Sequence, residues 1–133
     1  MKTLVVYYTK TGTTKTVAEA VIAGKNCDYD ELRYDEKDKT INYSRDPSDY
    51  EHVILLSPIW AFTLAEPMKQ YISKHNSNIK NNKRYDLLVT CSGLGLRGCV
   101  KYCVSTIGKP PENALKFRSS HVKRGVFDIS AVL

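Results

Sequence analysis

Threonine is concentrated in a short segment near the start of the chain, Thr-Lys-Thr-Gly-Thr-Thr at residues 9–14. The segment lies between an apolar run, TLVVYY at 3–8, and an amphipathic stretch, TKTVAEAVIAG at 14–24. The first amides of a helix have no partner within the helix and lie at the positive end of its dipole, so they form an anion site. Threonine hydroxyls would add donors, and Gly12 would let the backbone approach closely. The segment therefore predicts a bound phosphate group.

Simpler interpretations of this segment remain open. An ordinary helix cap uses one hydroxyl, whereas five threonines lie between residues 9 and 16. Lys10 would add charge to an anion site, or it would only face solvent. The spacing matches neither GxxxxGK followed by Ser or Thr, nor GxGxxG, so the Walker A and dinucleotide-binding loops are excluded.

Two further segments have unusual chemistry. SPIWAFT at 57–63 follows an apolar run and carries Trp60 and Phe62. These aromatic rings would offer a stacking surface to a flat heterocycle, although Trp60 could instead fold back onto the core. CSGLGLRG at 91–98 is rich in glycine, so it offers free amides and little steric bulk. A phosphate site, a stacking ring and an amide-lined edge together suit a planar mononucleotide.

Hydrophobic periodicity predicts the elements that position these segments. Buried apolar runs alternate with amphipathic stretches, which is typical of a parallel α/β sheet with helices on both faces. The expected strands are 3–8, 28–34, 52–57, 85–92 and 114–122, and the expected helices are 14–24, 66–75 and 99–108. We expect 35–50 to be a surface connection, 58–65 a loop and 76–84 a polar connection. Ligands of such sheets bind beyond the carboxyl ends of the strands, where the three unusual segments would meet.

These motifs resemble those of flavodoxins. VVYYTKTGTTKTVAEAV at 5–21 matches the flavodoxin phosphate signature, LLSPIWAFTLAEPMKQYI at 55–72 resembles the second flavin-binding loop, and LLVTCSGLG at 87–95 is a looser match. The similarity extends over roughly residues 2–122. It implies one flavodoxin-like domain over residues 1–133, a doubly wound α/β fold with a five-stranded parallel sheet in the order 2-1-3-4-5, and noncovalently bound FMN. The helix complement would be reduced, because 35–50 lacks an amphipathic helix and the chain ends soon after the last strand.

The resemblance also implies roles for individual residues. The phosphate would be surrounded by Thr9, Lys10, Thr11, Gly12, Thr13 and Thr14. The ribityl chain and one face of the isoalloxazine would be lined by Pro58, Ile59, Trp60 and Ala61. The pyrimidine edge would be flanked by Cys91, Ser92, Gly93 and Gly95. We predict no catalytic side chain, because the flavin carries the redox chemistry and the protein sets its potential. We predict no metal ligand, because the histidines and cysteines lack the spacing of a metal site.

Charge is distributed unevenly along the chain. Residues 1–66 contain 8 Lys and Arg against 11 Asp and Glu, a net charge of −3, whereas residues 67–133 contain 12 against 3, a net charge of +9. Electron-carrier flavodoxins are typically acidic, and in place of acids the third segment has Arg97. A cation beside the flavin would stabilise its reduced anion, so we expect a less reducing flavin that favours two-electron steps. Alternatively, Arg97 points into water.

We expect flavodoxin-like electron transfer to or from a partner protein, which the basic half suggests is acidic. A small FMN-dependent oxidoreductase acting on an acceptor such as a quinone is the first alternative. A binding module without flavin is the second. The absence of a nucleic-acid motif disfavours nucleic-acid binding. The lack of a long apolar segment or signal peptide favours a cytoplasmic protein without a membrane partner.

Two structural expectations complete the interpretation. The cysteines (Cys27, Cys91, Cys99 and Cys103) lack disulfide or metal spacing, so they are expected to be small buried hydrophobes. The shortened end of the chain would leave part of one sheet face bare. We expect the tail, VFDISAVL at 126–133, to cover that face as a short helical turn, or a second subunit to cover it in a homodimer.

Overall fold

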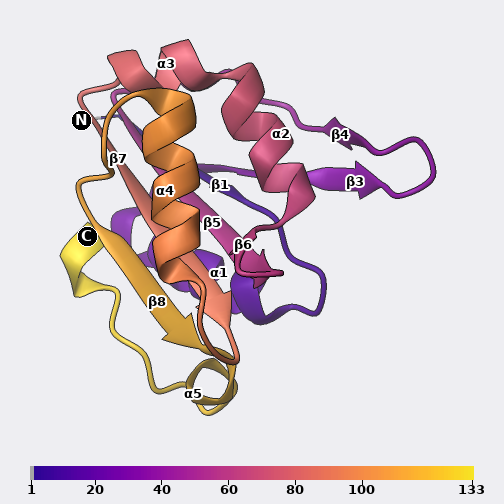
Figure 1. The fold of residues 1–133 in the computed structure, drawn as a ribbon. Coiled ribbons are helices and arrows are strands. Elements are labelled where there is room, and N and C mark those ends of the chain that lie inside the picture. Colours follow the sequence, from indigo (N-terminus) through magenta and orange to yellow (C-terminus); the bar gives the residue numbers. More distant parts are fainter. Residues whose placement is uncertain (1) are drawn as a thin grey trace.

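The computed structural model describes residues 2–133, which form a central sheet with helices on both faces (Figure 1). In chain order the elements, with η for 3₁₀ helices, are β1 (Thr3–Tyr7), α1 (Thr13–Lys25), β2 (Asp28–Glu31), β3 (Arg33–Asp35), β4 (Thr40–Asn42), η1 (Pro47–Asp49), β5 (His52–Trp60), β6 (Thr63–Leu64), α2 (Glu66–Lys74), α3 (Asn76–Asn81), β7 (Arg84–Cys91), α4 (Leu96–Ile107), β8 (Ala114–Arg118), α5 (Ser119–Lys123) and η2 (Ser130–Val132).

The sheet has the order β2-β1-β5-β7-β8, and all of these strands are parallel. Counted along the chain, the parallel strands are in the order 2-1-3-4-5, so the predicted topology is confirmed. The short β6 is antiparallel to the end of β5, and β3 pairs with β4 in a separate hairpin. This hairpin projects away from the sheet in Figure 1. The carboxyl ends of β1, β5, β7 and β8 therefore share one edge.

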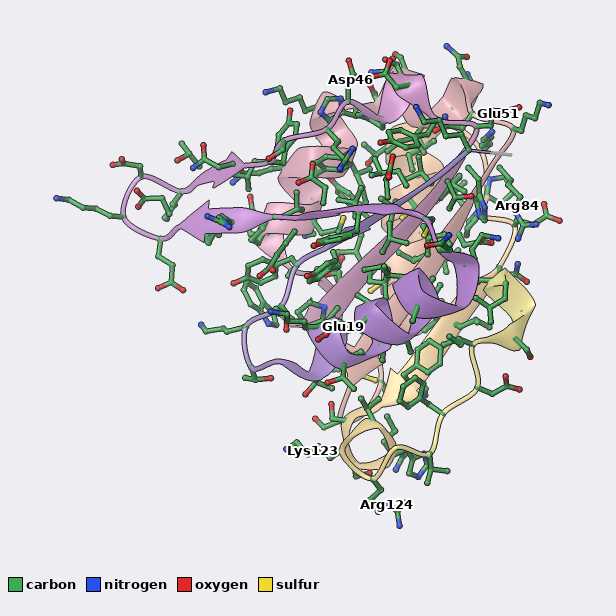
Figure 2. The ribbon with its side chains drawn as sticks, turned by 180° about the vertical axis from the view of Figure 1, so that it is seen from behind. Glu19, Asp46, Glu51, Arg84, Lys123 and Arg124 are labelled. Atoms are coloured by element: carbon green, nitrogen blue, oxygen red, sulfur yellow. The ribbon has the colours of Figure 1, made fainter. Side chains whose placement is uncertain are left out.

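Side chains alternate along the strands and fill a core on each face. On one face Leu4 and Val6 pack in a cluster with residues of α2, α3 and α4. On the other face Val5 and Tyr7 pack with α1, α5 and the tail. Figure 2 shows α1 lying across this second face. The strands are buried on both faces, which explains why they are continuous apolar runs.

The tail covers the second face, as predicted. Val132 in η2 is buried, and the rings of Phe117 and Phe127 meet edge to face with their centroids 6.1 Å apart. The helical turn is the short η2, because the chain between Lys123 and Ser130 is irregular. Coverage of this face therefore comes from within the chain.

The loop predicted at 58–65 is wrong in its first half. β5 continues through Pro58, Ile59 and Trp60, then turns back into β6. Pro58 is tolerated in β5 because the neighbouring β1 has already ended at that level. The last hydrogen bond on that side of β5 runs from the Tyr8 amide to the Leu56 carbonyl oxygen. Trp60 therefore lies on a strand instead of a free loop.

Two connections contain unpredicted structure. Residues 35–50 hold the end of β3, β4 and η1, and the predicted strand 28–34 breaks at the buried Leu32. The polar connection contains α3, which Ile79 anchors in the core with an exposed fraction of 0%. Residues 35–50 have two buried apolar residues, Pro47 and Tyr50, and residues 76–84 have one, Ile79, which is too weak a periodic signal to predict either element.

Three element boundaries also differ from the predictions. α1 passes through Gly24 to Lys25 and is capped by Asn26, whose φ is 52°. α4 begins at Leu96, three residues before the predicted start, so Gly98 lies inside a helix. β8 ends at Arg118 and α5 follows. Within residues 2–133, every helix is too short or too polar to cross a membrane.

Candidate functional site

A hollow of about 190 Å³ opens at the carboxyl edge of the sheet. It lies where β1, β5, β7 and β8 end, so four segments distant in the sequence contribute to it. Its lining residues are Lys10, Thr11, Thr13, Thr14, Pro58, Ile59, Trp60, Thr90, Cys91, Ser92 and Ser119. The structure thus brings the three segments singled out from the sequence to a single site.

The start of α1 provides unpaired amide donors to this site. The first bond of the helix runs from the Thr16 amide to the Gly12 carbonyl oxygen at 3.0 Å. The amides of Thr13, Thr14 and Lys15 precede that bond, and within residues 2–133 no side chain caps the helix. Gly12 is the N-cap with a φ of 94°, a conformation that strongly favours glycine. This geometry has the features of an anion site.

The threonine hydroxyls do not all serve the same purpose. Those of Thr11 and Thr13 form an exposed, long hydrogen bond with each other at 3.5 Å, so both remain accessible to a ligand. The Thr9 hydroxyl oxygen accepts a hydrogen bond from the Gly12 amide at 3.0 Å and shapes the loop. Thr14 is buried, and its hydroxyl bonds that of Thr90 at 2.7 Å. The prediction that each hydroxyl contributes directly to the phosphate site is therefore too simple.

Lys10 lies over Trp60. Its Nζ atom is 5.4 Å from the centroid of the indole ring and 3.5 Å from Glu36 Oε1 in the turn between β3 and β4. Lys10 is therefore attracted by a ring and a carboxylate, rather than simply facing solvent. Trp60 itself is half-buried, and its ring meets Tyr8 edge to face with centroids 5.6 Å apart. Trp60 thus lines the hollow while it also packs against the core.

The β5–β6 hairpin has a strained tip beside the site. Ala61 and Phe62 occupy the two central positions with φ of 49° and 67°, which non-glycine residues rarely adopt. Gly95 and Gly98 lie against this tip: a Cβ on Gly98 would be 2.2 Å from the Phe62 carbonyl oxygen, and one on Gly95 would be 2.6 Å from Ile59 Cγ2. Both glycines therefore allow α4 to pack against the hairpin, whereas the sequence suggested that they border a ligand.

The predicted site residues fall into two groups. Nine of them line the hollow: Lys10, Thr11, Thr13, Thr14, Pro58, Ile59, Trp60, Cys91 and Ser92. Outside the lining are Thr9 and Gly12, which shape the first loop, Ala61 and Gly95 at the hairpin contact, and the exposed Gly93. Sequence reasoning missed Thr90 and Ser119. Their positions at the ends of two strands were the available signal, because ligands collect at such ends.

Three of the four cysteines (Cys91, Cys99 and Cys103) are buried as expected, and Cys27 is only partly buried. Cys99 and Cys103 are fully buried, and burial raises the pKa of each thiol to about 12, so both stay protonated. Burial also raises the pKa of the partly buried Cys27. Cys91 lines the hollow and donates a hydrogen bond from Sγ to the Gly93 carbonyl oxygen at 3.1 Å.

The hollow fits part of a mononucleotide. Sites that enclose a small ligand usually measure about 300–1,000 Å³, so this one would hold a phosphate and chain while a flat ring lay at its open rim. A larger hollow of about 530 Å³ lies between β2 and residues 42–45. Its inner carboxylate, Asp30, is already occupied by the amides of Ser44 and Arg45. The smaller hollow lies at the start of α1, where the first helix amides have no partner among the described residues.

Comparison with known proteins gives a consistent result. A family model described as the flavodoxin domain matches residues 4–112. A search of curated protein sequences finds no significant match.

Solved structures with this fold include several flavoproteins. A flavoprotein from Lactobacillus acidophilus in complex with FMN is 21% identical with a TM-score of 0.70, over 92% of this chain and 97% of that one. A flavodoxin from Fusobacterium nucleatum bound to FMN is 21% identical with a TM-score of 0.53, over 86% and 69%. An NADH:FMN oxidoreductase is 15% identical with a TM-score of 0.65, over 99% and 83%. At these identities the likeness shows a shared fold.

Proposed function

Because the chain belongs to the flavodoxin domain family, we propose that it binds FMN and transfers electrons to or from a partner protein. One observation carries the proposal. The unpaired amides at the start of α1, the Trp60 ring and the Cys91–Ser92 segment converge on one hollow at the carboxyl edge of the sheet. This combination suits a phosphate linked to a flat heterocycle.

The residues of the chain would divide the work of holding FMN. The amides of Thr13 and Thr14, with the Thr11 hydroxyl, would bind the phosphate, and the α1 dipole would favour its negative charge. Pro58 and Ile59 would exclude water from the ribityl chain. Trp60 would support one face of the flavin ring. Bound FMN supplies the redox chemistry, and the surrounding charges set its potential.

Titration of the flavin-free protein with FMN tests the proposal. We expect saturable binding of one FMN per chain, seen as a shift in flavin absorption and quenched fluorescence. Riboflavin, which lacks the phosphate, should bind far more weakly if the start of α1 is the anchor. Failure to bind FMN at micromolar concentrations would contradict the proposal and favour a binding module that has lost the flavin.

Replacing Trp60 by Leu should weaken FMN binding by about tenfold, since aromatic stacking contributes about 0.5–1.5 kcal/mol beyond buried area. The fluorescence of the bound flavin should also be less quenched. Fluorescence titration measures both quantities, and the matched variant Trp60→Phe should keep most of the affinity because it preserves a stacking ring. Equal affinity in the wild type and Trp60→Leu would show that the ring does not contact the flavin.

A second candidate is a small FMN-dependent oxidoreductase that works in two-electron steps on an acceptor such as a quinone. Arg97 supports it, because this exposed cation lies in the first turn of α4 beside the site. An NADH:FMN oxidoreductase also shares the fold. Steady-state assays with NADH and a soluble quinone would distinguish this enzyme from a carrier that needs a protein partner.

Replacing Arg97 by Gln should lower the flavin midpoint potential by an amount on the order of tens of millivolts, because exposed charges interact by about 1 kcal/mol or less. The direction follows from losing a cation that stabilises the reduced anion. Potentiometric titration measures it, and Lys80→Gln on α3 serves as a control of equal charge. A very low second-electron potential in the wild type would show that Arg97 does not stabilise the reduced flavin.

A further inference from the structure

An exposed apolar pair lies beside the candidate site. Phe62 at the β5–β6 tip is 71% exposed, and Leu94 just before α4 is 77% exposed. The two belong to touching segments, because the Phe62 backbone packs against Gly95 and Gly98. Large apolar side chains that gather next to a ligand site mark a surface for another molecule.

Local energetics disfavour this arrangement, which points to a functional reason for it. Phe62 is held outward by two consecutive left-handed residues, a conformation that costs about 1–3 kcal/mol for each non-glycine residue. Arg97 lies in the first turn of α4, at the positive end of the helix dipole, and that turn has no acidic residue. Local rules that are broken together usually mark functional sites.

The surroundings of the pair are basic. Residues 87–127 contain seven Lys and Arg and one acid, Glu112. Glu112 precedes β8, and its amide bonds the Tyr85 carbonyl oxygen, so it lies at the other end of the sheet. Lys109 also lies there, because its carbonyl oxygen accepts from the Tyr85 hydroxyl, which leaves six cations and no acid in this range. We define the docking face as Phe62, Leu94, Arg97, Lys101 and Arg118, of which the three basic residues are exposed.

The basic residues flank the apolar centre from two elements. Arg97 and Lys101 are four positions apart on α4, so they share a face of that helix. Arg118 ends β8, opposite Cys91 of the site. Lys123, the last residue of α5, and Arg124 after it are two further exposed cations, which Figure 2 shows together at that end of the molecule. One exposed acid also lies near this surface: Glu66, which begins α2 two residues after the end of β6.

We infer that the docking face binds an acidic redox protein; this rests on the FMN-dependent function proposed above. An apolar centre within a charged rim is the usual anatomy of a protein interface, and the positive rim selects a negative partner. A second copy of this chain is disfavoured, because a twofold contact would set the same basic residues against each other. The aliphatic Leu94 at the centre favours a protein over a nucleic acid.

Binding to two haem proteins of opposite charge tests the inference. The ¹⁵N-labelled protein, loaded with FMN and in parallel without it, is titrated at low salt with cytochrome b5, which is acidic, and with cytochrome c, which is basic. We expect cytochrome b5 to bind about tenfold more tightly, with an affinity that falls as salt is added. The resonances of Phe62 and Leu94 should shift in that complex.

Matched variants locate the contact. Lys101→Glu should weaken cytochrome b5 binding by about fivefold, whereas Lys80→Glu, on an exposed helical lysine of α3, should leave it unchanged. Phe62→Asn should weaken binding even at high salt, and it is compatible with the left-handed turn. An equal loss of cytochrome b5 affinity in Lys101→Glu and Lys80→Glu would overturn the inference.

Other occupants give distinct results. Tighter binding of a 20-nucleotide thymidine oligomer than of cytochrome b5 would replace the inference with a nucleic-acid surface. A dimer in sedimentation analysis that Phe62→Asn dissociates would replace it with self-association. FMN absorption is measured in the same samples, so an unloaded protein contradicts the proposed function, whereas a loaded protein that does not discriminate between the cytochromes contradicts only the docking face.

Discussion

Replacing Asp86 by Ala will lower the free energy of unfolding by about 3–5 kcal/mol, because it removes the buried carboxylate and leaves its polar partners without an acceptor. Asp86 is fully buried in β7. Its carboxylate accepts hydrogen bonds from His52 Nε2 at 2.5 Å and Arg84 Nη2 at 3.1 Å. It also accepts from the amide and Nδ2 of Asn113 at 2.9 and 3.0 Å. Urea unfolding at pH 7 measures the loss.

This cluster joins three strands at the amino edge of the sheet. His52 begins β5, Arg84 begins β7 and Asn113 precedes β8. In Figure 2, Arg84 lies at the opposite end of the molecule from Lys123 of α5. The cluster is therefore structural, and flavin affinity measured on the folded variant should be unchanged. A loss below 1 kcal/mol would show that the cluster contributes little.

The pH dependence of stability gives a second measurement. Burial raises the pKa of Asp86, but hydrogen bonds from His52 and Asn113 and the charge of Arg84 outweigh it and hold the pKa below its ordinary value. A depressed pKa contributes stability above the unfolded value of about 3.9, and this contribution is lost as pH falls through the folded value. The difference in free energy of unfolding between wild type and Asp86→Ala should therefore shrink below about pH 4. Asp38 is an exposed acid in the β3–β4 turn, so Asp38→Asn is the control. It should change neither the free energy of unfolding at pH 7 nor the dependence of that free energy on pH.

Replacing Gly12 by Ala will weaken FMN binding by about 10–100-fold if the start of α1 binds the phosphate, because each 1.4 kcal/mol of lost binding is about tenfold. Gly12 has a φ of 94°, so Ala adds strain of about 1–2 kcal/mol to the loop. Apart from its two chain neighbours, a Cβ at Gly12 would meet no atom of residues 2–133 within 4 Å, so it would project into open space between two residues that line the hollow. Titration with FMN measures the affinity, and urea unfolding measures the strain.

Gly125→Ala provides the matched control. Gly125 has a φ of 72°, and a Cβ there would also meet no described atom within 4 Å. It lies after α5, whereas Gly12 stands between Thr11 and Thr13, which line the hollow. Both variants should lose similar stability, but only Gly12→Ala should lose FMN. Equal FMN affinity in the two would place the phosphate elsewhere.

Much of the fold follows from local patterns. TLVVYY, HVILLS and YDLLVTCS are continuous apolar runs, and such runs form buried strands because both faces of a parallel sheet are covered. The alternation with helices predicts a parallel sheet covered on both faces through right-handed crossovers, and the resemblance to flavodoxins implied the strand order. The carboxyl ends of those strands share an edge, so the approximate position of the site could also be predicted.

The details of the site depend on contacts between distant residues, which no local pattern contains. Thr14 and Thr90 are 76 positions apart, and their hydrogen bond withdraws one of the predicted donors into the core. Lys10 meets Glu36 only because the β3–β4 hairpin replaces an expected surface connection.

Glycine shows the same division. The sequence indicates a flexible, open segment at 91–98, but the tertiary structure uses Gly95 and Gly98 to bring α4 against the Phe62 backbone. A glycine looks the same in the sequence whether a ligand or another backbone segment occupies the space beside it. Residue types therefore determined the strands and the edge at which the three unusual segments meet, and the resemblance of the motifs supplied the strand order. The role of each hydroxyl, ring and glycine at that edge was decided by which distant segment packed beside it.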